Sequence, residues 1–235
     1  MGINIDGNSF LSSLDKAFNC INNEDKVCQV VTINPEMYAQ AEEDKEFKNI
    51  LNEAEMVVPD GVGIKIALKL KGHNVERIPG IDFARRLLDW CAKNSKPVAI
   101  VGSKEEVIIK AVENLKKEIE NLDIVYYHNG YFDNNEEIYE KLKQANPRLI
   151  LVALGSPKQE YFIFGAKNML PPCLMVGVGG SLDVWSGEVK RAPKIYQKFG
   201  LEWLYRTISQ PERFKRIFPA LPLFLWKVIT YKEGK

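Results

Sequence analysis

Six short, largely apolar segments alternate along the chain with stretches that have helical spacing. The apolar segments span residues 27–33, 56–58, 97–101, 124–127, 149–154 and 173–178. Several of them are apolar throughout, which is typical of parallel strands covered on both faces. The helical patterns span residues 35–53, 61–71, 82–94, 104–121, 136–146 and 158–168. This order predicts an α/β fold with a doubly wound, mostly parallel, Rossmann-like sheet. Ser103 and Glu106 have the spacing of a capping box, which predicts the start of the fourth helix.

The pattern changes after Pro193. Helical spacing covers residues 195–207 and 210–218, and a short aromatic helix is predicted over 223–231. Pro219 and Pro222 interrupt the last two because proline cannot continue a helix. We therefore predict an α/β core over residues 1–192 and a C-terminal helical appendage over 193–235.

Charge is distributed unevenly along the chain. The net charge is only +1, which gives no general attraction to nucleic acid. From Lys190 to the end there are 11 Lys and Arg against 3 Asp and Glu, so this part carries +8 and the rest −7. A basic, aromatic tail favours contact with an anionic partner such as a membrane surface, and a solvated charged face is the alternative.

The chain has no feature of an exported or membrane-spanning protein. Its first residues lack the apolar core of a signal peptide, and no apolar run reaches the roughly 18 residues that cross a bilayer. The four cysteines form no CxxC pair and there are only two histidines, which predicts reduced thiols and no metal site. We expect a cytoplasmic protein that lies on the inner face of the cell membrane. Self-association through the apolar tail into a homo-oligomer stays open.

Polar or glycine-rich turns follow most of the predicted strands. In open α/β sheets, ligands bind beyond the carboxyl ends of the strands. Backbone N–H groups and helix N-termini at such turns suit a phosphorylated ligand. The candidate residues are Thr32, Asn34, Asp60, Gly102, Gly155, Gln159, Gly179, Gly180 and Asp183.

Each of these turns has a plainer interpretation when taken alone. The glycines at 177–180 depart from the GxGxxG dinucleotide fingerprint, which disfavours a nicotinamide-binding domain. Asp60 has the sequence context of a helix N-cap. Asn34 followed by Pro35 is typical of a turn that starts a helix.

Together, five blocks resemble a known family. TINPEMYAQA, VVPDGVGI, ERIPGIDF, LVALGSPKQE and VGVGGSLDVWSGEVKRAP occur in the order and spacing of the WecG/TagA/CpsF glycosyltransferases (glycosyltransferase family 26). The resemblance covers about residues 1–218. Its most specific parts are the PDGxG, GxPKQE and GGxxDxxxGxxxRAP patterns.

The resemblance implies a transferase that uses a UDP-sugar donor and a polyprenyl-diphosphate-linked acceptor. The wall teichoic acid member moves N-acetylmannosamine from UDP-ManNAc to the 4-hydroxyl of N-acetylglucosamine on undecaprenyl diphosphate. It inverts the anomeric centre and needs neither a metal nor a cofactor. This chain has no DxD motif to hold a divalent ion against UDP, which agrees with that expectation.

The resemblance also assigns roles to residues around the reacting centre. Asp60 is the candidate general base, and Thr32 and Asn34 would orient a sugar hydroxyl or Asp60 itself. Gln159 matches a position that contacts the reacting sugars. Arg77 would hold a phosphate or the acceptor. The plainer alternative for Arg77 is an ion pair with Glu76 or Asp82.

The remaining candidates would bind the nucleotide and its diphosphate. Gly102, Gly155, Gly179 and Gly180 would allow close approach of the backbone. Asp183 would bind uridine or cap the following turn. Arg206, Arg213 and Arg216 would clamp the diphosphate, because guanidinium groups match phosphate oxygens in pairs. The alternative for the arginines is a basic surface that faces the membrane.

Two other functions stay open. A member of the same family with another donor, such as UDP-N-acetylmannosaminuronic acid or UDP-glucose, would act in common antigen or capsule assembly. A non-catalytic nucleotide-binding module would use the basic tail to dock on a partner protein.

Overall fold

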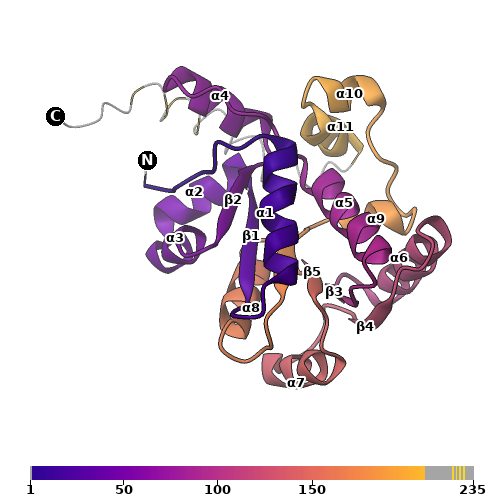
Figure 1. The fold of residues 1–235 in the computed structure, drawn as a ribbon. Coiled ribbons are helices and arrows are strands. Elements are labelled where there is room, and N and C mark those ends of the chain that lie inside the picture. The colour runs from indigo at the N-terminus through magenta and orange to yellow at the C-terminus, as the bar shows by residue number, and fades with distance from the viewer. Residues whose placement is uncertain (1, 210–223, 225, 227, 229, 231–235) are drawn as a thin grey trace.

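The fold is a single six-stranded parallel sheet with helices on both faces (Figure 1). The computed structural model describes residues 2–209 together with 224, 226, 228 and 230, and only the backbone of Arg206 and Ser209. The strand order is β2-β1-β6-β5-β3-β4, and every pair of neighbours is parallel. The predicted doubly wound α/β fold is confirmed.

All six strands lie within three residues of their predicted bounds at either end. They are β1 (Cys28–Ile33), β2 (Met56–Pro59), β3 (Val98–Gly102), β4 (Ile124–His128), β5 (Leu149–Ala153) and β6 (Leu174–Gly177). Five of them are buried along their whole length, which explains their apolar sequences. The edge strand β4 alternates between buried and accessible residues instead.

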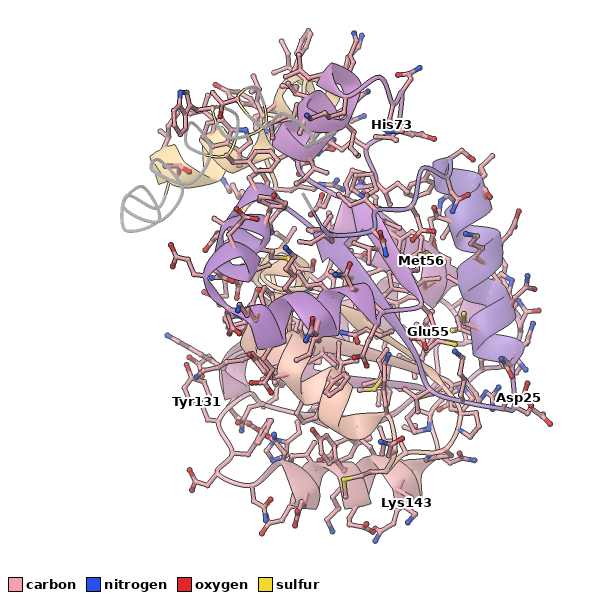
Figure 2. All side chains as sticks on the ribbon, turned by 90° about the vertical axis from the view of Figure 1, so that its left-hand side faces the viewer. Asp25, Glu55, Met56, His73, Tyr131 and Lys143 are labelled. Atoms are coloured by element: carbon pink, nitrogen blue, oxygen red, sulfur yellow. The ribbon has the colours of Figure 1, made fainter. Side chains whose placement is uncertain are left out.

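Helices precede the sheet, connect its strands and follow it. They are α1 (Phe10–Asn22), α2 (Pro35–Glu43), α3 (Lys45–Asn52), α4 (Val62–Leu70), α5 (Gly80–Lys93), α6 (Glu105–Glu118), α7 (Asn135–Ala145), α8 (Lys158–Ala166), α9 (Ser181–Trp185), α10 (Lys194–Lys198) and α11 (Glu202–Ser209). In Figure 2, His73 beyond α4 and Lys143 near the end of α7 lie at opposite ends of the molecule. The carboxyl ends of the strands face the end that carries His73.

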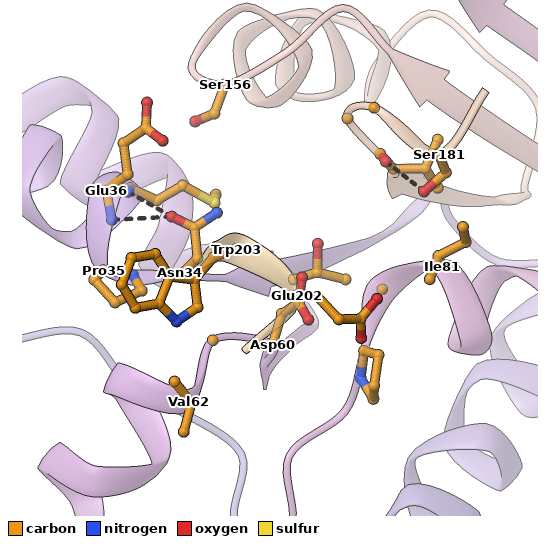
Figure 3. Close-up of a pocket in the computed structure, with 18 of the residues that line it drawn as sticks. Asn34, Pro35, Glu36, Asp60, Val62, Ile81, Ser156, Ser181, Glu202 and Trp203 are labelled. Carbon is orange, nitrogen blue, oxygen red and sulfur yellow. Dashed lines mark hydrogen bonds between the residues drawn. The ribbon is translucent and has the colours of Figure 1, made fainter. Parts of the chain in front are cut away.

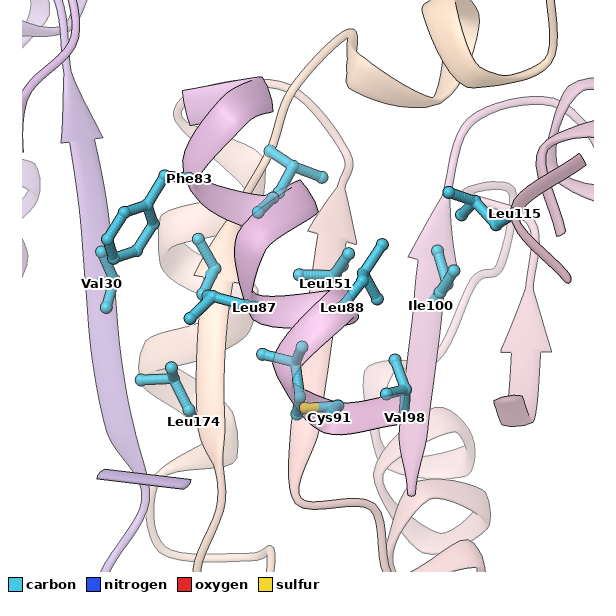
Figure 4. Close-up of a cluster of buried hydrophobic side chains, with 14 of the residues drawn as sticks. Val30, Phe83, Leu87, Leu88, Cys91, Val98, Ile100, Leu115, Leu151 and Leu174 are labelled. Carbon is cyan, nitrogen blue, oxygen red and sulfur yellow. The ribbon is translucent and has the colours of Figure 1, made fainter. Parts of the chain in front are cut away.

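The core consists of side chains packed on both faces of the sheet. On one face, α5 places Phe83, Leu87, Leu88 and Cys91 against strand residues such as Val30 (Figure 4). A separate cluster lies under α7 and α8, and a third lies between the β1–β2 side of the sheet and α2, α3 and α4. Burial of this apolar surface is the main force that holds the layers together.

Four local predictions differ from the structure. Helices α1 and α9 were not predicted, although apolar residues at 10, 14, 17, 18 and 21 give α1 a buried face. The single helix predicted over 35–53 is two helices, because the Asp44 side chain accepts a hydrogen bond from the Phe47 N–H and starts α3. The predicted capping box is wrong: Lys104 is the N-cap of α6, and Ser103 has a positive φ of 61°.

The fourth difference lies in the C-terminal segment. The helix predicted over 195–207 is interrupted between α10 and α11, where Gly200 adopts a φ of +70°. The helix predicted over 210–218 lies outside the described residues. Phe224 and Val228 are helical and pack in the third cluster, where the Phe224 and Tyr38 rings lie 5.0 Å apart. No helix among the described residues combines the length and apolar character needed to cross a bilayer.

Candidate active site

A cavity of about 310 Å³ opens at the carboxyl ends of β1, β2, β5 and β6 (Figure 3). Helix α2, which follows β1, lies on one face of the sheet, whereas α9, which follows the neighbouring strand β6, lies on the other. The chain therefore diverges between these two strands and leaves a crevice, which is the usual ligand position in such sheets. Its polar or charged lining side chains are Thr32, Asn34, Glu36, Asp60, Arg77, Ser156, Gln159, Ser181 and Glu202.

Asp60 lies at the floor of this cavity, directly after β2. Its N–H donates to the Ile33 carbonyl at 3.0 Å, which extends the β1–β2 pairing by one residue and fixes where the side chain begins. Gly61 follows because a Cβ there would lie 2.7 Å from Cδ of Pro35. The N-cap of α4 is Gly61, with no side-chain cap. The alternative interpretation of Asp60 as an N-cap is therefore wrong.

Thr32 and Asn34 flank Asp60 from the end of β1. The Thr32 hydroxyl donates to the Gly177 carbonyl at 3.3 Å, which ties β1 to β6 beside the cavity. The Asn34 Oδ1 accepts from the N–H groups of Glu36 and Met37, at 3.0 and 3.1 Å, and so caps α2. Asn34 therefore starts a helix, as its plainer interpretation held, and lines the cavity as well.

Gln159 reaches the cavity from the first turn of α8 and is buried. Its Oε1 accepts from the Gly179 N–H at 3.1 Å, and its Nε2 donates to Glu160 Oε1 at 2.7 Å. Gly179 has a φ of +48°, and Gly155 has a φ of +75° in the opposite wall, both in the region that favours glycine. These turns let bare backbone line the cavity.

Burial raises the pKa of the Glu160 carboxyl to about 7, with Gln159 and Ser156 acting in the opposite direction. An unfolded glutamate has a pKa of 4.5, so between these two values the folded protein holds a proton that the unfolded chain has lost. We expect this group to lower the free energy of unfolding as pH rises through the window, by about 3 kcal/mol in total.

Urea unfolding at pH 5 and pH 8 measures this effect. The difference between the two free energies should shrink in Glu160→Gln, which cannot ionise, and persist in Glu137→Gln, an exposed carboxyl of α7. An unchanged pH dependence in Glu160→Gln would contradict the raised pKa.

Arg77 lines the cavity and is held by the C-terminal segment. Its Nη2 donates to the Gln197 carbonyl at 2.9 Å and lies 3.5 Å from Glu202 Oε1. The other oxygen of Glu202 lies 3.6 Å from Nε of Arg191. One carboxylate therefore neutralises part of the charge of two guanidinium groups, of which Arg77 lines the cavity.

The ion-pair alternatives predicted for Arg77 are both wrong. Glu76 accepts a hydrogen bond from the N–H of Phe10 at 2.8 Å. Asp82 forms a two-pronged pair with Arg191, with both N–O distances at 2.7 Å. The ion-pair partner of Arg77 is Glu202 instead.

Gly102 and Asp183, two of the predicted ligand-binding residues, lie outside the lining of this cavity. Gly102 ends β3, where a Cβ would lie 2.4 Å from the Ala153 backbone, so close strand packing accounts for this glycine. The Asp183 carboxylate accepts from the Ser103 hydroxyl at 3.4 Å. Arg213, Arg216 and the side chain of Arg206 lie outside the described part of the chain.

The first turn of α11 contributes Glu202 and Trp203 to the cavity, neither of which was predicted. Figure 3 draws Glu202 and Trp203 among the residues that line the cavity, together with Asp60 and Asn34. No motif marks these residues, because they enter the site only through the folding back of the C-terminal segment. Ser156 and Ser181 were also missed, although they lie within the GSPKQE and GGSLD segments that were singled out.

Comparison of the sequence with known proteins identifies the family of the chain that forms this cavity. The sequence profile of the Glycosyl transferase WecG/TagA/CpsF family matches residues 1–235. The chain belongs to this family of glycosyltransferases.

Two relatives of this glycosyltransferase have named activities. A Bacillus spizizenii protein is 34% identical over 227 residues, which cover 96% of this chain and 87% of the relative. A Bacillus subtilis protein is 33% identical over 235 residues, which cover 99% and 90%. Both are named N-acetylglucosaminyldiphosphoundecaprenol N-acetyl-beta-D-mannosaminyltransferase.

The cavity offers a glycosyltransferase three carboxylates, a guanidinium and several turns lined by backbone. The described residues contain no cluster of three or more His, Cys, Asp or Glu arranged to hold a metal ion. The four cysteines are free thiols, as predicted. The carboxylates of the lining can accept protons, and Arg77 can bind an anion.

Proposed function

We propose that this enzyme moves N-acetylmannosamine from UDP-ManNAc to the 4-hydroxyl of N-acetylglucosamine on undecaprenyl diphosphate, with inversion and without a metal. The main support is the position of Asp60, whose carboxylate lines a cavity at a strand end among polar side chains. The named activity of two relatives that align along most of the chain supports the same substrates.

In this proposal Asp60 is the general base. Its carboxylate accepts the proton of the acceptor hydroxyl as that oxygen attacks the anomeric carbon of the donor. The bond between the anomeric carbon and the UDP oxygen breaks at the same time, and UDP leaves with its electron pair. Attack from the opposite side of the ring inverts the anomeric centre. Thr32 and Asn34 would orient a sugar hydroxyl beside this carboxylate.

The leaving diphosphate would bind at the turns that surround the cavity. The N-terminal ends of α4 and α8 open onto it, and the positive end of each helix dipole favours negative charge. Arg77 would contact a phosphate by exchanging part of its contact with Glu202. We propose that Gly155, Gly179 and Gly180 approach the nucleotide directly. Gly102 and Asp183 lie outside the cavity lining, so they would contact the nucleotide only where it extends past the cavity toward the end of β3.

We also propose that Arg206, Arg213 and Arg216 complete the diphosphate site. The described cavity contains one guanidinium, from Arg77, and it is already in contact with Glu202. A diphosphate therefore needs further cations, and the basic C-terminal segment, which already contributes Glu202 and Trp203 to the cavity, would supply them. The same segment would place the enzyme on the anionic inner face of the membrane, where the lipid acceptor is held. Its self-association stays a prediction.

The charge of the cavity favours a neutral donor sugar over a uronic acid. Its described charged side chains are three carboxylates, from Glu36, Asp60 and Glu202, and the guanidinium of Arg77. A second carboxylate on the donor would be repelled by this surplus of negative charge. UDP-glucose is not excluded by charge, so it belongs in any donor panel.

The test is transfer of labelled sugar from a panel of UDP donors to a short-chain lipid diphosphate. We expect turnover with UDP-ManNAc, little with its uronic acid analogue, and no loss of rate when EDTA is added. Preferential use of the uronic acid, or a rate abolished by EDTA and restored by a divalent ion, would contradict the proposed donor or the metal-independent mechanism respectively.

A further inference from the structure

We propose that Glu160 is a positioning residue for sugar transfer, whose carboxylate holds the side-chain amide of Gln159 in its working orientation. This inference rests on the proposed function, because it assumes that Gln159 contacts the reacting sugars. Glu160 itself lies behind the cavity wall and is not among the lining residues.

The first observation is the environment of Glu160. The residue is 1% exposed, which is rare for a glutamate, and no ion pair within the described part of the chain involves it. Its Oε2 is buried with no hydrogen-bond partner among the described residues. A buried carboxyl that is only partly hydrogen-bonded destabilises a fold, so its presence calls for a role other than packing.

The second observation is the chain of hydrogen bonds that runs from Glu160 to the cavity. The Gly179 N–H can only donate, so Gln159 must turn Oε1 toward it, at 3.1 Å. Nε2 then faces Glu160 Oε1, at 2.7 Å, which accepts its hydrogen. Both ends of the amide are thereby specified. The second hydrogen of Nε2 remains as the donor that Gln159 can offer to a sugar oxygen.

The third observation is that β6 is shaped to admit this pair. A Cβ at Gly177 would lie 2.5 Å from Gln159 Nε2 and 3.2 Å from Glu160 Oε1. The Gly177 carbonyl also accepts the Thr32 hydroxyl at 3.3 Å. The Gln159 amide, the Glu160 carboxyl and the Thr32 hydroxyl therefore all lie against Gly177 of β6. A movement of Gln159 and Glu160 would therefore also change the surroundings of Thr32, which lies beside Asp60 in the cavity.

Three variants test the proposal in the full-length enzyme. Glu160→Met keeps the side-chain length but offers no oxygen to Gln159, and it should lower kcat by about 10- to 100-fold. Glu160→Gln keeps an acceptor oxygen and should recover most of that loss. Binding of UDP, measured by calorimetry, should be unchanged in both, because the amide contacts sugar and not nucleotide. Glu137→Gln, on the surface of α7, should match the wild type.

A second measurement needs no variant. The side-chain amide hydrogens of Gln159, followed by NMR in the folded wild-type protein, should shift as Glu160 titrates. Gln159 amide resonances that do not shift between pH 5 and 8 would overturn the positioning role. A Glu160→Met enzyme with the kcat of the wild type would overturn it as well. Absence of any sugar transfer by the wild type would instead overturn the proposed function, so the two failures can be told apart.

Discussion

Asp60→Asn should lower the rate of sugar transfer by about 10²- to 10⁴-fold, the usual contribution of a general base. The amide has the same shape as the carboxylate but cannot accept the proton of the acceptor hydroxyl. One hydrogen bond that positions residue 60 runs from its backbone N–H to the Ile33 carbonyl, and it survives the substitution. The thermal midpoint and the affinity for UDP should therefore change little.

The measurement is initial-rate transfer to a short-chain lipid diphosphate, with Asp15→Asn as the matched control. Asp15 is an exposed carboxyl on α1, and neutralising it should leave the rate unaltered. If Asp60→Asn retains a rate within about 3-fold of the wild type, the proton has another acceptor and Asp60 is not the base. A large loss accompanied by unfolding would be a stability effect, which circular dichroism would reveal.

Removal of the residues after Pro193 should leave a folded core with little activity. The C-terminal segment supplies Gly200, Glu202 and Trp203 to the cavity. Its removal would also take away the contacts of Arg77 with the Gln197 carbonyl and the Glu202 carboxylate. An opened site admits water and no longer holds substrates in register, so we expect a loss of at least about 100-fold. Two of the three core clusters contain no described residue beyond the cut. The third loses Phe224 and Val228, which should lower stability without abolishing folding.

Rate, circular dichroism and urea unfolding on the truncated and full-length proteins separate these effects. Trp203→Ala in the full chain is the companion variant, because it keeps the segment but removes an aromatic wall of the cavity. It should reproduce part of the loss in rate. Full turnover by the truncated protein on a lipid-linked acceptor would show that the segment neither completes the site nor supplies its cations.

The strands and most connecting helices were predictable because their signals are local. β1 is mostly apolar and β5 is apolar at every position, and both are buried along their whole length, which only a sheet covered on both faces accommodates. Parallel strands bring their carboxyl ends to one edge, so Thr32, Asp60 and Gln159 were expected to meet, and they do. The helix boundary at Asp44 was missed because it depends on one side-chain cap, and such a cap does not alter the helical spacing of the apolar residues on either side.

What the amino-acid sequence determined by itself was the order of strands and helices, the edge of the sheet that carries chemistry, and the family. Only the tertiary structure decided which charges meet there. Glu202 faces Arg77 across 125 residues, and Glu160 becomes buried although its neighbour Lys158 is exposed. The physical reason is that the pairing and the desolvation of a charge depend on groups brought together by folding, whereas periodicity reports only on neighbours along the chain.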